Sequence, residues 1–472
     1  QPAQTRPELP GRVGHHGHPA PGMSRQPDAA AAIGLGPTAD SKAKSAIRAG
    51  VLAFFVDQFD IYLPVLVLAP VLSYFQPADI PASGAAILSA VIFASTLVFR
   101  PVGAAIFGHL ADTTGRKNAT LIAVAGFGAV TLLIAALPGQ ETIGIWSIVL
   151  LIGLRSLNGI FLGGEYSAAV PLAMEWSPKR RRGYVGGLIL AGSPAAYGSI
   201  AALTIVLLQL LPSAGPDSAY AQWGWRIPFV IGALLAAVLF VHYYRSVEES
   251  GTKRTTGHRL PIVELFVGRN RRSLLQIFIL MSGVWLANNM VSAVLPGLQA
   301  TVIGLSGTQV SITAVAKSAV GVVAFIAFGV LSQRIGRRRF YVGYGVVMAL
   351  LGSACYAVVM SVEMTFPVRV AMTALVGVLT IGTFGPVASY ITERFPAEIR
   401  ATGFGIGYSL ALVLPAFYAF YLDALDNVVP QQYAPVLLIV LAGILVSVGG
   451  WLGPETRGVD MGSPVPPTPN LQ

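Results

Sequence analysis

The stretch GHLADTTGRK, residues 108–117, separates two long apolar segments and has a counterpart in the second half of the chain. That counterpart, GVLSQRIGRR at 329–338, repeats the glycine spacing and ends in basic residues as well. A second pair agrees, because EWSPKRRRG at 175–183 and ERFPAEIRATG at 393–403 share Glu-x-x-Pro and an arginine four residues after the proline. Since both pairs are separated by about 220 residues, we expect two similar halves.

The segments around these loops are long enough to cross a bilayer. The chain has 472 residues, of which 54% are hydrophobic and only 11% charged, and its mean hydropathy is +0.67. Because roughly 20 apolar residues cross the hydrocarbon core as a helix, the sequence predicts an all-α membrane protein with about twelve transmembrane helices in two pseudo-symmetric six-helix bundles. The predicted spans lie near 46–74, 84–111, 119–138, 144–174, 184–211, 226–244, 273–300, 309–332, 340–361, 368–391, 402–422 and 432–452.

The predicted organisation has five parts. Residues 1–44, rich in Pro, Gly, Ala and His, are expected to form a disordered cytoplasmic tail. A first bundle at 45–245 and a second at 273–453 are joined by a basic cytoplasmic linker at 246–272, and a cytoplasmic tail follows at 454–472.

The basic residues predict the orientation in the membrane. They concentrate on alternate connections, including Arg116 with Lys117, 179–182, 245–272 and 334–339, whereas the intervening connections carry mostly acidic residues. We therefore expect a multi-pass plasma-membrane protein with both termini in the cytoplasm. This distribution explains the net charge of +10 without a nucleic-acid partner.

The loop motifs, in their position between spans, resemble the major facilitator superfamily over essentially the whole membrane-spanning length. Gly108-x-x-x-Asp112-x-x-Gly115-Arg116-Lys117 is similar to the signature loop of that family, although Gln333 stands where the second copy would have Asp. Segments such as RSLNGIFLGGE and PETRG are most similar to the metabolite:proton symporters and the sugar porters. DQFD at 57–60 resembles the Asp-Gly-x-Asp of aromatic-acid:proton symporters, with Gln58 in place of Gly.

The two signature-type loops are expected to form a conformational latch. Their glycines permit tight reversals and close approach, while Asp112 and Arg116 can accept and donate charged hydrogen bonds at helix ends. A basic loop that only sets the topology is the alternative. The predicted latch residues are Gly108, Asp112, Gly115, Arg116, Lys117, Gly329, Gly336 and Arg337.

Six ionisable residues fall well inside the spans: Asp57, Asp60, Arg100, Arg155, Glu165 and Lys317. Each costs about 2.5–3.5 kcal/mol at the centre of an inserted helix, so we expect none to face lipid. Asp57 and Asp60 share a helix face, and Pro64 can loosen the backbone beside them. Two close carboxylates in a low-dielectric cleft cannot easily both stay ionised, which is what a proton carrier requires. A static ion pair that only orients helices is the alternative.

Resemblance to the superfamily's coupling motif, carried by Arg155-x-x-x-Gly159-x-x-x-Gly163, implies that Arg155 governs the charge of the two aspartates. Glu165 is predicted either to take part in coupling or to brace the signature loop. Arg100 and Lys317, one cation in each half, are predicted to clamp an anion, although Arg100 could instead form a permanent salt bridge to Asp57 or Asp60.

Polar and aromatic residues are predicted to complete the substrate lining, although each by itself is more often a packing residue. These candidates are Tyr62, Asn158, Tyr166, Tyr197, Trp285, Asn288, Asn289 and Tyr390.

The predicted function is a proton-coupled symporter that imports a small organic anion, such as a mono- or dicarboxylate or an aromatic acid, by alternating access. Signals for enzyme chemistry, a metal site or a cofactor are absent from the sequence, so we expect a non-enzymatic protein driven by a proton gradient and functional as a monomer. The alternatives are proton symport of a neutral or zwitterionic solute, drug:proton antiport, and a sensor that binds solute without moving it.

Overall fold

The computed structural model describes residues 37–76, 82–211, 215, 217–247 and 261–461. These residues form helices and no strands, and twelve helical segments are long and apolar enough to cross a membrane. The predicted fold class is therefore confirmed. The twelve segments are Ala43–Leu68, Ile87–Thr114, Arg116–Ala135, Trp146–Glu175, Lys179–Leu210, Tyr220–Ser246, Gly268–Thr301, Gly307–Ile335, Arg337–Ser361, Phe366–Thr392, Ala397–Asp426 and Ala434–Leu452.

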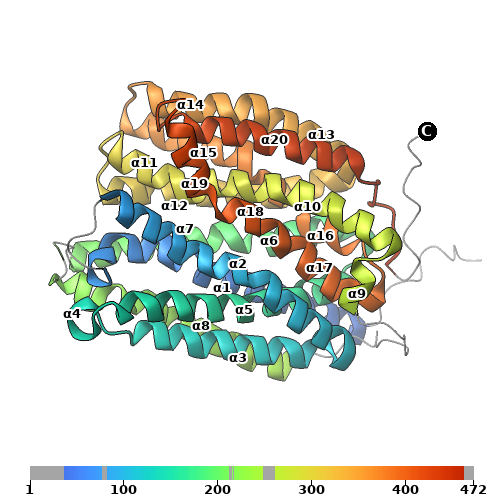
Figure 1. Ribbon diagram of the computed structural model, residues 1–472. Helices are drawn as coiled ribbons and strands as arrows, with labels where there is room; N and C mark the ends of the chain where they lie inside the picture. The colour runs from blue at the N-terminus through green and yellow to red at the C-terminus, as the bar shows by residue number, and fades with distance from the viewer. Residues whose placement is uncertain (1–36, 77–81, 212–214, 216, 248–260, 462–472) are drawn as a thin grey trace, which may run out of the picture. The chain divides into compact units, whose positions relative to one another are not determined.

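The helices of the first half lie side by side in the lower part of Figure 1. Helix α2 packs along α5, and α3 packs against both α5 and α8. The helices of this half are α1 (Pro37–Leu63), α2 (Ala82–Thr114), α3 (Arg116–Ala135), α4 (Gln140–Ile143), α5 (Trp146–Glu175), α6 (Arg182–Leu190), α7 (Gly192–Leu210) and α8 (Arg226–Ser246).

The second half repeats these pairings. Helix α12 packs along α15, as α2 does along α5, and α13 packs along α20, as α3 does along α8. Its helices are α9 (Pro261–Leu265), α10 (Gly268–Asn289), α11 (Leu295–Thr301), α12 (Gly307–Ile335), α13 (Arg337–Val347), α14 (Ser353–Ser361), α15 (Phe366–Ile381), α16 (Val387–Thr392), α17 (Arg400–Ser409), α18 (Val413–Ala416), α19 (Tyr418–Asp426) and α20 (Ala434–Leu452).

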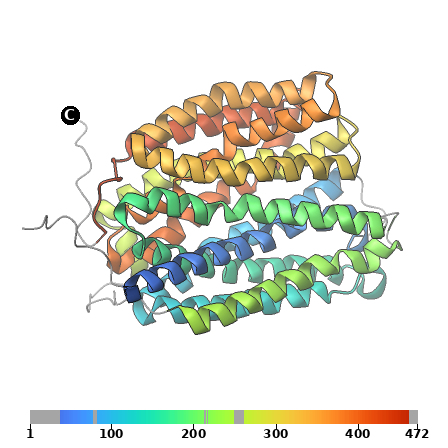
Figure 2. The same cartoon turned by 180° about the vertical axis from the view of Figure 1, so that it is seen from behind.

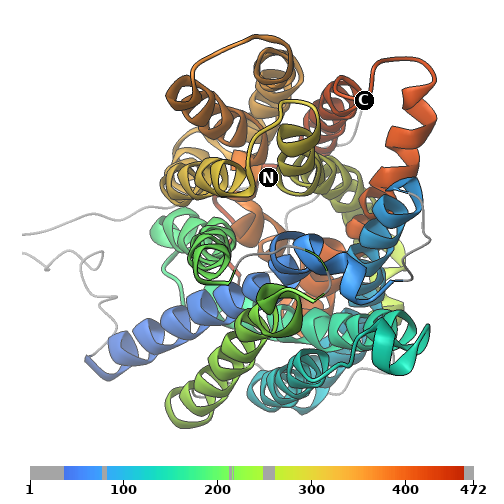
Figure 3. The same ribbon diagram turned by 90° about the vertical axis from the view of Figure 1, so that its left-hand side faces the viewer.

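The contacts between the halves follow the same symmetry. Helix α2 packs against α17, and its counterpart α12 packs against α6 and α7. Figure 2 shows α12 and the α6–α7 segment side by side, and Figure 3 shows the helices of each half grouped together in a view along their axes. The loops after α2, α5, α12 and α16 lie at one end of the helices, at the right of Figure 1 near α9 and α17. We call this the basic end.

Several spans are interrupted, and the first interruption follows the two aspartates. Helix α1 ends at Leu63, and residues Pro64–Leu68 form a π-helical turn. Because proline has no N–H for the helical ladder, it loosens the backbone there, as predicted. A second π-helical turn, Met290–Val294, follows α10.

The structure moves three of the predicted domain limits. Helix α1 begins at Pro37 rather than after residue 44, with proline in the first position, where its missing N–H costs nothing. Helix α10 begins at Gly268, so the arginines at 269–272 occupy its first turns, where long charged side chains can reach water. Residues 454–461, assigned to a tail, hydrogen-bond to both halves. The rest of the predicted N- and C-terminal tails lies outside the described residues.

Glycines bring α2 and α5 into backbone contact. A Cβ atom added at Gly159 would collide with the backbone oxygen of Thr96, and one at Gly163 would collide with that of Arg100. The spacing Arg155-x-x-x-Gly159-x-x-x-Gly163 thus places one face of α5 directly on the α2 backbone, as small residues do at helix contacts in membranes. This close approach sets the relative height of Arg100 and Arg155.

We therefore expect Gly163→Ala to destabilise the protein by about 1–3 kcal/mol, because the added methyl group overpacks this contact. Gly153→Ala is the matched control, since Gly153 lies on the same helix with no atom within 4 Å of its added Cβ. Thermal unfolding in detergent should show a lower Tm for Gly163→Ala alone. Equal Tm values for the two variants would contradict the role of this contact.

Candidate functional site

Asp57 of α1 forms an ion pair with Arg100 of α2. Nη2 of Arg100 lies 2.9 and 3.0 Å from the two carboxylate oxygens, and both side chains are fully buried. The guanidinium also lies 4.6 Å from the ring centroid of Tyr166. Arg100 therefore does not clamp an anion in this state. It forms the salt bridge that the sequence analysis left as the alternative.

Asp60 forms a second ion pair, one helical turn further along α1. Nη1 of Arg155 lies 3.1 Å from its carboxylate, so Arg155 reaches the partner proposed for it. The hydroxyl of Thr131 donates to the other carboxylate oxygen at 2.7 Å, and Asn158 donates to that hydroxyl at 3.1 Å. Asn158 thus supports this pair.

Glu165 of α5 is buried without a partner. Neither carboxylate oxygen has a hydrogen-bond partner among the described residues, and the side chain is 0% exposed. Its charged neighbours are Asp57 and Arg100. The structure therefore shows no bracing of the signature loop. Glu165 lies two residues beyond Gly163, the glycine that contacts the Arg100 backbone, and this places it close to Arg100.

Lys317 of α12 borders a small central cavity between the halves. The cavity holds about 10 Å³, room for a single water, and its lining residues come from α1, α7, α10, α12, α15 and the π-turn after α10. They are Tyr62, Ser193, Pro194, Tyr197, Asn288, Ser292, Lys317, Ser318, Phe325 and Ile381. The site is closed in this state, so any larger ligand requires the halves to separate.

The Lys317 ammonium is held only by neutral groups. It donates to the carbonyl oxygen of Val291 at 3.0 Å and to Oγ of Ser292 at 3.4 Å, and it lies 4.4 Å from the ring centroid of Tyr197. Among the residues with described positions, no carboxylate forms an ion pair with it. A buried cation whose neighbours are all neutral is a site for an anion.

Tyrosines of the first half close the cavity against the second half. Tyr62 and Asn288 exchange hydrogen bonds of 3.3 and 3.4 Å, and Tyr197 donates to the carbonyl oxygen of Ser292 at 2.8 Å. The rings of Tyr62 and Tyr197 meet edge to face, with centroids 4.9 Å apart. Three of the residues predicted to line the substrate site, Tyr62, Tyr197 and Asn288, thus do border one cavity together with Lys317.

The other predicted lining residues lie elsewhere. Tyr166 packs on Arg100 and on Tyr408, and the Trp285 ring also packs on Tyr408, in a layer beside the cavity. Asn289 donates to the carbonyl oxygen of Pro415, and Tyr390 packs on Tyr341 within the second half. Adjacent residues such as Asn288 and Asn289 face different sides of a helix, so only one of the pair reaches the cavity.

Sequence reasoning missed the serines of the cavity. Ser292 lies one helical turn after Asn288, a spacing that could have identified it. Ser193 has a further role, because it donates to Oε1 of Gln58 at 2.9 Å, and Nε2 of Gln58 donates to Asp57 at 2.7 Å. Gln58 thus connects the cavity to the Asp57–Arg100 pair by a continuous hydrogen-bonded chain.

At the basic end, Asp112 joins the halves. Its carboxylate accepts from the backbone N–H groups of Ala401 and Thr402 at 3.3 and 3.0 Å, and from the Thr402 hydroxyl at 2.6 Å. An acid at the N-terminus of α17 also interacts favourably with the helix dipole. Gly108 adjoins the same contact, because a Cβ there would meet the Thr402 backbone.

Gln333 makes the corresponding contact in the second copy. Its side-chain oxygen accepts from the backbone N–H of Gly183, at the start of α6, at 3.2 Å. The turns themselves also match, since Gly115 and Gly336 have φ values of 116° and 104°, which glycine adopts without strain. The departure from the signature therefore keeps the hydrogen bond and removes the charge. Gly329 approaches Gly183 at this crossing.

Arginines complete the two contacts. Glu175 forms ion pairs with Arg116 of its own half and with Arg400 of the other half, the latter at 2.7 Å. The counterpart of the first pair, Arg337 with Glu393, spans 3.3 Å inside the second half. Lys117, also predicted for the latch, donates to the carbonyl oxygen of Tyr244 within the first half.

We expect Asp112→Ala to open the basic end, because two buried backbone N–H groups lose their acceptor, at about 1–3 kcal/mol each. Spin labels at the exposed positions Thr113 and Glu398, on a Cys355→Ser background, should report longer distances between the halves. Thr114→Ala is the control, since the Thr114 hydroxyl donates only to its own helix. An unchanged distance distribution in Asp112→Ala would show that this contact does not hold the halves together.

Comparisons with known proteins agree with this architecture. The pattern of the Major Facilitator Superfamily matches residues 50–419. The inner membrane metabolite transport protein YhjE of Escherichia coli K12 is 31% identical over 386 residues, covering 80% of this chain and 86% of YhjE. The citrate-proton symporter of Salmonella typhi is 28% identical, with 76% and 82% covered.

Among solved structures, the proton:xylose symporter XylE of E. coli superimposes with a TM-score of 0.69 at 17% identity, covering 87% of this chain and 95% of XylE. This likeness concerns the fold. The match over most of the chain, together with the twelve apolar helices, shows a multi-pass integral membrane transport protein, not an enzyme. The chain belongs to the Major Facilitator Superfamily.

Proposed function

We propose that this transporter is a proton-coupled symporter that imports a small organic anion. The observation that carries the proposal is Lys317, a buried ammonium at a central cavity between the halves that is held only by neutral groups. The citrate-proton symporter, a relative of this chain, carries a name that combines an organic anion with a proton.

The cavity is suited to a carboxylate. A charge-assisted hydrogen bond from an ammonium is stronger than one from a neutral donor, and the Tyr62, Ser193 and Ser318 hydroxyls and the Asn288 amide supply further polar groups. Bound anion would neutralise Lys317 and remove the cost of an isolated charge in the bilayer. Substrate binding would in this way favour the closed state over an open, hydrated one.

Proton coupling is assigned to Asp57, Asp60, Arg155 and Glu165. The two aspartates are each paired with an arginine, so in this state their charges are cancelled within the first half. Glu165 has no such partner, and a carboxyl group buried without donors is least costly in its neutral, protonated form. If Arg100 leaves Asp57, either acid can take it as partner, and the other then holds the proton.

The chain through Gln58 offers a route by which substrate acts on this arginine. A ligand that takes the hydrogen bond of Ser193 removes one support of Gln58, which in turn holds Asp57 against Arg100. Occupancy of the cavity would thereby alter the competition between Asp57 and Glu165 for Arg100. Glycine, which stands at this position in the resembled motif, has no side chain to make this link.

Orientation and cycle complete the proposal. The basic end faces the cytoplasm, in agreement with the concentration of arginine and lysine there. It is closed by Asp112, Gln333 and Glu175, so the state described here precedes release to the cytoplasm. The cycle proceeds by rocking of the halves, with the chain acting as a monomer and the domain limits near those predicted.

We expect Lys317→Gln to weaken binding of a carboxylate substrate by about 10–100-fold, because a buried charge-assisted hydrogen bond is lost. Purified protein is first screened with organic acids and neutral solutes by thermal shift, and the hits are then measured by uptake into proteoliposomes. Lys179→Gln, which removes an exposed lysine at the basic end, should leave uptake unchanged.

The same vesicles separate the competing functions. Undiminished uptake by Lys317→Gln would refute the anion site and favour a neutral or zwitterionic solute. Expulsion of substrate by an inward proton gradient would identify an antiporter, and binding without accumulation would identify a sensor.

Glu165→Gln should abolish accumulation driven by a proton gradient while preserving exchange of labelled for unlabelled substrate. The glutamine mimics a permanently protonated acid, so the carrier moves with substrate but cannot release a proton. Glu141→Gln, at an exposed position on α4, should retain both activities. Gradient-driven accumulation that survives in Glu165→Gln would remove this residue from the coupling scheme.

A further inference from the structure

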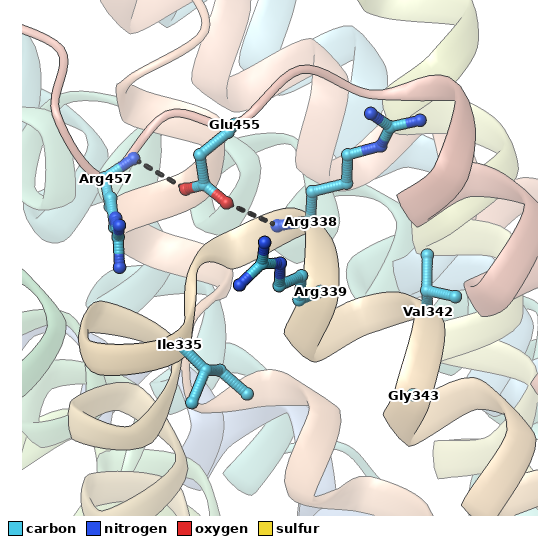
Figure 4. A pocket seen from close by; sticks show the side chains of 7 residues that line it. All are labelled: Ile335, Arg338, Arg339, Val342, Gly343, Glu455 and Arg457. Carbon is cyan, nitrogen blue, oxygen red and sulfur yellow. Dashed lines mark hydrogen bonds between the residues drawn. The ribbon is translucent and has the colours of Figure 1, made fainter.

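A second, larger cavity lies at the basic end, apart from the central site. It has a volume of about 590 Å³ and is lined by residues from the ends of α12 and α13 and from the segment after α20. Figure 4 shows its residues: Ile335, Arg338, Arg339, Val342, Gly343, Glu455 and Arg457. Two transmembrane segments meet here, one ending at Ile335 and the next beginning at Arg337, so the cavity lies at the level where a bilayer has its headgroups.

Three arginines and one acid give this cavity a net positive charge. The acid is already satisfied, because the Glu455 carboxylate accepts from the backbone N–H groups of Arg337, Arg338 and Arg457 at 3.0, 3.3 and 3.0 Å. Two of these bonds are drawn in Figure 4. Glu455 therefore caps the start of α13 and forms no ion pair with the arginine side chains among the residues whose positions are described.

The guanidinium groups are left available. Those of Arg338 and Arg339 have no hydrogen-bond or ion-pair partner within the described part of the chain, and Arg457 donates through Nη1 to the carbonyl oxygen of Arg334 at 2.7 Å. The positions of these side chains around one hollow are suited to the oxygen atoms of a phosphate, which arginine can bind with two parallel hydrogen bonds.

Apolar side chains continue from the cavity along the outer surface of the helices. Ile335 and Val342 line the cavity, and the exposed Leu331 and Val346 lie one turn further on α12 and α13. Trp451, which is 53% exposed, ends α20 beside them, and tryptophan is enriched at the membrane–water interface. A molecule with a phosphate in the cavity could therefore lay a hydrocarbon chain along these helices.

We propose that this cavity binds an anionic phospholipid, with the phosphate held by Arg338, Arg339 and Arg457 and an acyl chain on Leu331, Ile335, Val342 and Val346. Basic pockets at the ends of membrane helices bind anionic headgroups in this way. The bound lipid would link α12, α13 and the segment at 454–457, which caps α13 beside the Gln333 contact. The proposal is independent of the transported substrate.

The test uses full-length protein in detergent, titrated with phosphatidylglycerol or with phosphatidylcholine of the same acyl chains and followed by native mass spectrometry. The double variant Arg338→Gln/Arg339→Gln should bind phosphatidylglycerol on the order of 10-fold more weakly, while its binding of phosphatidylcholine stays unchanged. The matched control, Arg180→Gln/Arg181→Gln, removes two exposed arginines at the same end outside the cavity and should bind normally.

Further arms keep the result decisive. The variant Arg338→Lys/Arg339→Lys should recover part of the binding, and equal Tm values would show that every variant is folded. Glycerol phosphate and inorganic phosphate, at concentrations equal to the lipid, should not displace it, since they lack the acyl chain. Displacement by either, or an equal loss of binding in the Arg180/Arg181 control, would overturn the proposal.

Discussion

A charge inside a bilayer must be paired, solvated or neutralised, and this constraint organises the centre of the protein. Of the six ionisable residues within the spans, four form two ion pairs in the first half, Asp57 with Arg100 and Asp60 with Arg155. The remaining two, Glu165 and Lys317, lie in different halves without an ionic partner among the described residues. One unpaired acid and one unpaired base are the groups that a proton and an anion would neutralise. The centre of the molecule therefore has the charge inventory of a symporter of the two.

The close packing of α2 on α5 makes this arrangement possible. Because Gly159 and Gly163 bring the two backbones into contact, Arg100 lies at the height of Asp57 and within the electrostatic reach of Glu165. A shift of one turn, 5.4 Å, would exchange the partners. The ion pairs thus depend on a backbone contact made by residues that carry no charge at all.

The two ends of the pseudo-symmetry are not equivalent. Asp112 and Gln333 occupy matching turns and accept from the first N–H groups of matching helices, but only Asp112 brings a charge to the helix N-terminus. A charged acceptor forms the stronger hydrogen bond, so the α2–α17 contact is the stronger of the two. The segment at 454–461 supports the weaker side, where Arg457 accepts from Gln333 through its carbonyl oxygen and Val459 accepts from Arg182.

The sequence by itself determined the number of spans, the repeat, the latch positions and the set of buried charges, because hydropathy, turn glycines and charge depend on local composition. It also indicated Arg155 as a partner for the aspartates, by resemblance, and Lys317 as a cation without an acid nearby. Only the tertiary structure decided that Arg100 pairs with Asp57, that Glu165 lies beside Arg100 rather than bracing a loop, and that Asn288 rather than Asn289 reaches the cavity. Those outcomes depend on the rotation and axial offset of helices distant in sequence, which their mutual packing sets.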